Sequence, residues 1–88
     1  MGEIEEIKNK TKEMLVDILL SGFEGINKAI LDDIEKLIEI YNLYNMQKGK
    51  ELLKELKVKL LKSNNGFKYD KKEIAKVYSQ VELYLSCL

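Results

Sequence analysis

The chain has 88 residues, which is enough for one small domain, because a domain usually takes about 100 to 200 residues. Apolar residues make up 45% of the chain and charged residues 34%, a balance typical of globular proteins. There is one Cys, and His, Arg, Trp and Pro do not occur. By itself the chain therefore offers no disulfide framework, no histidine-containing zinc site and no histidine for acid–base catalysis.

The net charge is zero, but the two halves of the chain differ in charge. Residues 1–45 carry ten acids and five lysines, whereas residues 46–88 carry five acids and ten lysines. We expect the halves to pack against each other with complementary charge; the alternative is that the basic half faces an acidic partner or nucleic acid.

The first predicted helix covers residues 3–21 and is followed by Gly22. Glycine suits a helix end because it adopts the left-handed conformation without steric cost. Thr11 fills a gap in the apolar stripe, which has the three- and four-residue spacing of one helical face. The stripe consists of Ile4, Ile7, Met14, Leu15, Ile18 and Leu19.

The second predicted helix covers residues 27–44, with Asn27 as its N-cap. Ile26 and Leu31 lie at the positions of a hydrophobic staple. Asn45 follows where many helices close with a left-handed residue, a conformation that Asn tolerates. The apolar face consists of Ile30, Ile34, Leu37, Ile38, Tyr41 and Tyr44.

A third helix is predicted over 47–62 and a fourth over 71–87. Gly49 leaves the start of the third helix open, and Asn65-Gly66 indicates a tight turn after it. Asp70 and Glu73 have the spacing of a capping box. The inward residues are Leu52, Leu53, Leu56, Leu60 and Leu61 in the third helix, and Ile74, Val77, Val81 and Leu85 in the fourth.

Short connections make consecutive helices antiparallel, which predicts an all-α fold. We expect a single domain, residues 1–88, that forms a compact antiparallel bundle of four helices. A three-helix core with the fourth helix docked across it is the alternative.

The chain start and its hydropathy favour a cytoplasmic protein that has no membrane segment. The first residues are acidic where a secretory signal would be basic. The longest apolar candidate, residues 14–20, is interrupted by Asp17 and is far shorter than the ~20 residues of a spanning helix.

The side chains that could carry chemistry do not form a recognisable reactive group. Asp32, Asp33, Glu35 and Glu39 alternate with an apolar stripe, so we expect them to face water, and no metal or other cofactor is predicted. Cys87 has no histidine to activate it and is expected to be a small apolar residue near the chain end. We therefore predict a protein that is not an enzyme.

Large aromatic side chains near helix ends are the candidate anchors for a protein partner. These residues are Phe23, Tyr41, Tyr44 and Phe67, and packing in the core is the alternative role for each of them.

Lysines of the C-terminal half could follow a phosphate backbone. The candidates are Lys50, Lys54, Lys57, Lys68, Lys71 and Lys72. Without Arg there is no bidentate reader of bases, so such binding to nucleic acid would be weak, nonspecific and sensitive to salt.

Three runs of residues resemble the helical region that adjoins the SWIM zinc finger in some bacterial proteins. They are residues 14–23 (MLVDILLSGF), 37–46 (LIEIYNLYNM) and 52–56 (LLKEL). The Cys and His ligands of the finger itself are absent, so the resemblance implies only an accessory helical module, which could work beside a separate zinc-finger protein.

Amphipathic helices without a catalytic constellation favour a noncatalytic module that binds another protein or a second copy of itself. Weak, nonspecific nucleic-acid binding is the alternative function.

Overall fold

The computed structural model describes residues 2–23, 25–64 and 71–88 and contains four helices. They are α1 (Glu3–Ser21), α2 (Lys28–Leu43), α3 (Gln47–Asn64) and α4 (Lys71–Ser86). The predicted all-α fold is confirmed, and the boundaries differ from the predicted ones by at most two residues. Phe67, Lys68 and the predicted cap Asp70 lie outside the described residues.

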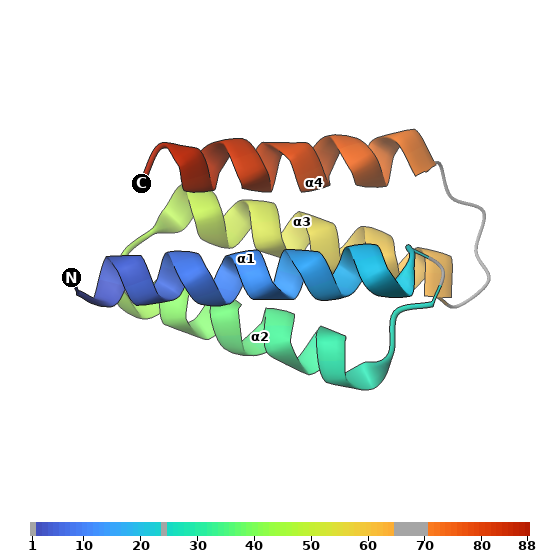
Figure 1. Cartoon of the computed structure of the whole chain (residues 1–88), viewed down its shortest axis with the longest axis horizontal. Coiled ribbons are helices and arrows are strands. Elements are labelled where there is room, and N and C mark those ends of the chain that lie inside the picture. Colours follow the sequence, from blue (N-terminus) through green and yellow to red (C-terminus); the bar gives the residue numbers. More distant parts are fainter. Residues whose placement is uncertain (1, 24, 65–70) are drawn as a thin grey trace.

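The helices run up and down along the long axis of a particle that measures 40 × 22 × 21 Å (Figure 1). Both chain ends lie at the same end of the bundle (Figure 1). α2 packs against α1 and α3, α3 packs against α4, and α4 returns to α1. The four-helix arrangement therefore holds, and α4 lies along the bundle and not across a three-helix core.

The α1–α2 connection is bounded by Gly22 and Asn27, the two residues that the sequence predicts as helix ends. The backbone N–H of Gly22 donates to the carbonyl of Ile18 at 2.9 Å, and Gly22 has a φ of +80°. Its ψ of 155° is extended, so Gly22 ends the helix in a conformation open almost only to glycine, not in the left-handed helical one. The carboxamide oxygen of Asn27 then accepts from the N–H of Ile30 at 3.0 Å, which confirms the predicted N-cap.

The α2–α3 connection is a Schellman motif. The N–H of Met46 donates to the carbonyl of Tyr41 at 2.8 Å, and the N–H of Asn45 donates to that of Asn42 at 3.1 Å. Asn45 takes the left-handed conformation with a φ of +60°, as its position predicts.

One core runs through the bundle and draws on all four helices. Its fully buried side chains include Ile18, Ile34, Leu53, Leu56 and Ile74. All four predicted inward residues of α4 are buried. The two halves of the chain also meet through charge, since Nζ of Lys57 lies 2.9 Å from a carboxylate oxygen of Glu35.

Some predicted core positions were wrong. Ile4, Leu19 and Tyr44 are exposed, and Leu61 is only half-buried. Ile4 and Tyr44 lie at helix ends, where the bundle no longer covers them. Leu19 lies on the side of α1 that faces α4, where the two helices pack most sparsely.

Candidate interaction surface

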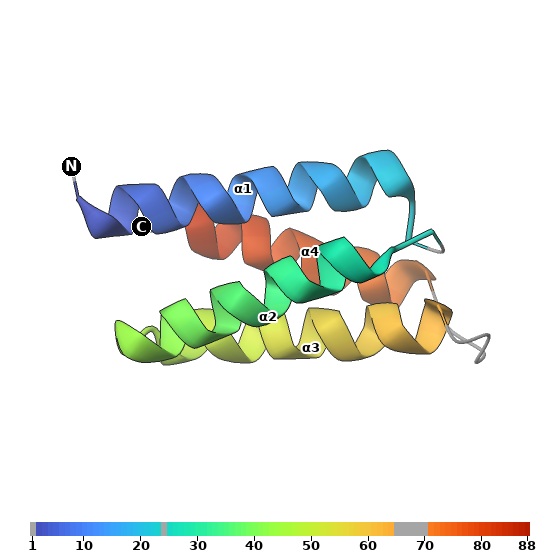
Figure 2. The same cartoon turned by 90° about the horizontal axis from the view of Figure 1, so that it is seen from below.

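Helix α1 is the least enclosed helix of the bundle. It packs against α2 and α4 and not against α3, and its contact with α4 is the sparsest in the structure. In Figure 2, α1 and α2 diverge toward the N-terminal end of α1. As a result, a groove lies along each side of α1.

The α1–α4 groove holds about 310 Å³ and is mainly apolar. Lys12 from α1 and Glu82 and Ser86 from α4 supply its polar side chains. The apolar lining consists of Leu15, Val16 and Leu19 from α1 with Tyr78 and Leu85 from α4.

An apolar ridge extends this groove onto the outer side of α1. The apolar ridge consists of Val16, Leu19 and Leu20, which are 52%, 61% and 82% exposed. Isolated exposed apolar residues are ordinary on protein surfaces, whereas a group beside a groove is typical of a docking site. Three such residues within five positions of one helix, next to an apolar groove, therefore mark the candidate site.

Tyr78 closes the bottom of the α1–α4 groove. Its hydroxyl donates to the carbonyl of Leu15 at 2.8 Å, which ties α4 to α1. Burial raises the pKa of the Tyr78 phenol above its ordinary value, and the negative charge of Glu82 raises this pKa further. The groove thus has a rigid aromatic floor and no reactive phenolate.

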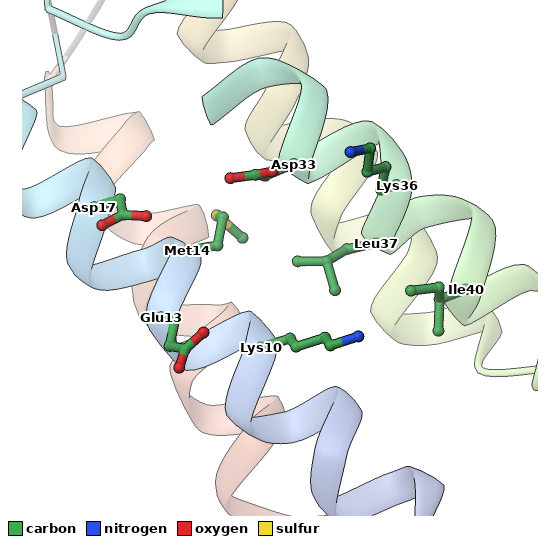
Figure 3. A pocket seen from close by; sticks show the side chains of 8 residues that line it. All are labelled: Lys10, Glu13, Met14, Asp17, Asp33, Lys36, Leu37 and Ile40. Atoms are coloured by element: carbon green, nitrogen blue, oxygen red, sulfur yellow. The ribbon is translucent and has the colours of Figure 1, made fainter. Parts of the chain in front are cut away.

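The α1–α2 groove is more charged. It holds about 280 Å³, and the apolar side chains of Met14, Leu37 and Ile40 line it (Figure 3). Lys10 reaches from α1 toward α2, and Asp33 points from α2 toward α1 (Figure 3). The remaining charged side chains of the lining are Glu13, Asp17 and Lys36. Lys10 and Ile40 also line a second hollow, with Leu43 and Tyr44, so the groove continues to the end of α2.

The structure places the predicted aromatic anchors in different environments. Tyr44 is 45% exposed and lines the α1–α2 groove. Phe23 is half-buried, and its ring centroid lies 6.2 Å from that of Tyr78. Tyr41 is only 1% exposed, so its assignment as an exposed anchor is corrected: it packs in the core, the alternative role. Phe67 lies outside the described residues.

The predicted lysines do not make a continuous free surface. Lys50 donates to the side-chain oxygen of Asn42 at 2.9 Å, and Lys57 pairs with Glu35 at the same distance. Lys54, Lys71 and Lys72 are exposed, and Lys72 has an interaction of its own. Lys68 lies outside the described residues. Two of the candidates therefore act as links from α3 to α2.

Sequence reasoning missed Val16 and Leu20. Both lie outside the buried stripe of α1 but only four residues apart, so they share an outward face of the helix. Apolar residues at helical spacing away from the core stripe were the signal that could have identified the ridge. Leu43 and Leu83 are likewise exposed and were not predicted.

The described residues do not assemble a recognisable reactive centre. Within residues 2–23, 25–64 and 71–88, no group of three or more Cys, Asp and Glu side chains could hold a metal ion. Cys87 is exposed, and Asp32, Asp33, Glu35 and Glu39 face water as predicted.

No protein-family model matches the chain, and neither does a curated protein or a solved structure. Among the helices that the structure describes, none combines the length and the apolar character needed to cross a bilayer.

Proposed function

We propose that the protein is a noncatalytic helical module that binds another helical protein through α1. The observation that carries this proposal is the apolar ridge of Val16, Leu19 and Leu20 beside the α1–α4 groove. An amphipathic helix that docks in such a groove recognises it through apolar anchors at helical spacing.

The energetics favour binding at this surface. Complete burial of one Leu or Val side chain is worth about 1.5–3 kcal/mol, and all three ridge residues are more than half exposed. The floor of the groove is fixed by the hydrogen bond from Tyr78 to Leu15, so little ordering of the protein is needed when a partner binds.

The proposal also agrees with the side chains present. Without histidine, a nucleophilic Ser or Cys lacks its usual base, whereas an interaction surface needs only shape, apolar area and charge. The resemblance to the helical region beside SWIM zinc fingers implies the same accessory role. We place this role in the cytoplasm.

A matched pair of variants tests the proposal. Leu20→Glu puts a charge on the ridge, and Leu83→Glu puts the same charge on an exposed leucine of α4 that lines neither groove. The wild-type protein and both variants serve as baits in the native host, and each partner identified by mass spectrometry is purified and titrated by calorimetry.

We expect a partner that binds the wild-type protein and Leu83→Glu but loses at least about tenfold in affinity for Leu20→Glu. Equal binding by both variants would place the partner elsewhere on the molecule. A protein that remains monomeric and has no reproducible partner would contradict the proposed function.

A further inference from the structure

We propose that a second copy of this chain docks on the α1–α4 groove and forms a two-fold symmetric dimer. This inference rests on the proposed function and names the partner of the same surface. The apolar ridge supplies the contact area, and the charges of the groove select the occupant.

The two charged side chains of the groove come from opposite helices and have opposite signs. Lys12 belongs to α1 and Glu82 to α4, and both line the same hollow. Within the described part of the chain neither side chain takes part in an ion pair or a hydrogen bond. Both charges are therefore available to a partner.

Symmetry determines which surface complements this arrangement. In a dimer with its two-fold axis parallel to α1 and α4, each α1 lies over the α4 of the other copy at the same level along the bundle. Lys12 then faces Glu82 of the partner subunit, and the same pair recurs on the other side of the axis. If the axis ran across the helices, α1 would face α1 and this pairing would be lost.

The same rotation also brings the apolar side chains of each α1 onto the partner subunit. Val16 and Leu19 follow Lys12 in α1, so in each copy they lie over the stretch of the partner's α4 that precedes Glu82, where Tyr78 lines the hollow. Because α1 and α4 are antiparallel in the chain, the helices that meet across the interface are antiparallel as well (Figure 1). One surface therefore supplies both halves of the contact, as an isologous dimer requires.

Association also suits a chain of this size. A small domain buries a smaller fraction of its surface than a large one and gains more from association. The α1–α4 contact is the sparsest of the bundle, so a second copy that docks there adds packing where the monomer has least.

Sedimentation velocity under reducing conditions, over about a hundredfold range of concentration, tests the dimer. The reducing agent is needed because an intermolecular disulfide through the exposed Cys87 would also produce a dimer. The test compares the wild-type protein with Lys12→Glu, with Glu82→Lys, and with the variant that carries both changes. Circular dichroism checks that each variant is folded.

We expect the wild-type protein to dimerise reversibly. Each single reversal should weaken the dimer at least about tenfold by opposing like charges, and the double reversal should recover most of this loss because it restores both pairs. Leu20→Glu should abolish the dimer, whereas Val58→Glu, which puts the same charge on an exposed residue of α3, should leave it intact.

A wild-type protein that is monomeric throughout, or a double reversal no stronger than the single ones, would overturn the dimer. If such a monomer binds an identified partner and loses it on Leu20→Glu, the dimer fails while the proposed function stands. If the wild-type protein neither dimerises nor binds a partner, both fail.

Discussion

The side chains of Thr11 in α1 and Tyr41 in α2 meet in the core, with their hydroxyl oxygens 2.7 Å apart. The Thr11 hydroxyl donates its one proton to the carbonyl of Ile7 at 2.8 Å, so Tyr41 must donate to Thr11. Tyr41 thus ties α2 to α1, as Tyr78 ties α4 to α1. Helix α1, whose packing is sparse on the α4 side, is held by one tyrosine on each side.

Replacing Thr11 with Val should cost about 1–3 kcal/mol of unfolding free energy, because it leaves the buried Tyr41 hydroxyl without a partner. Tyr41→Phe should cost less, since Thr11 keeps its bond to Ile7. Urea denaturation of the two single variants and the double variant checks this. Additive losses would show that the two hydroxyls do not interact.

Gly49→Ala should destabilise the protein by about 1–3 kcal/mol through overpacking, although alanine favours a helix. A Cβ atom at this position would lie 2.6 Å from Cδ2 of Tyr41 and 2.7 Å from Cε2 of Tyr84. Gly2→Ala is the control, because a Cβ atom there meets nothing within 4 Å. Equal thermal stability of the two variants would mean that the rings of Tyr41 and Tyr84 move aside without destabilising the protein.

How far the sequence predicts this structure depends on the kind of feature. The stripes and caps identify the four helices, and Asn27 and Asn45 act as predicted because capping depends only on neighbours in the chain. Tyr41 lies on the predicted apolar face of the second helix, so the stripe predicts its burial, but a stripe does not identify the residue opposite, here Thr11. Leu20 lies outside the core stripe of α1, so the stripe does not identify the ridge to which it belongs.

Stability should fall as the pH rises above 10, through the tyrosines. Burial raises the pKa of both Tyr41 and Tyr78 above 10.0 in the folded protein. A hydrogen bond that Thr11 donates to the ionised phenolate offsets part of the Tyr41 pKa shift, and Tyr84 adds to the shift. A raised pKa means that the folded state holds its proton more tightly, so the stabilisation is full below the unfolded pKa and is lost as the pH rises through the folded one.

Urea denaturation between about pH 8 and pH 11 measures this loss. The double variant Tyr41→Phe with Tyr78→Phe should lose less stability across that range than the wild-type protein. Titration of the lysines is common to both proteins and cancels in the comparison. Parallel curves for the two proteins would exclude Tyr41 and Tyr78 as the cause.

Labelled DNA and RNA should bind weakly or not at all at physiological salt. Lys50 and Lys57 are engaged with Asn42 and Glu35, and the chain has no Arg for base readout. Fluorescence anisotropy at two salt concentrations checks this expectation. Tight binding that Lys54→Ala with Lys71→Ala removes would favour the nucleic-acid function predicted as the alternative.

The most direct test of the interaction surface is a series of amide NMR spectra recorded from dilute to concentrated protein. We predict that signals from residues 12–20 and 78–86 shift progressively with concentration, while those of the α2–α3 contact around Glu35 and Lys57 stay fixed. Spectra that do not change, or shifts confined to α2 and α3, would contradict association through the α1–α4 groove.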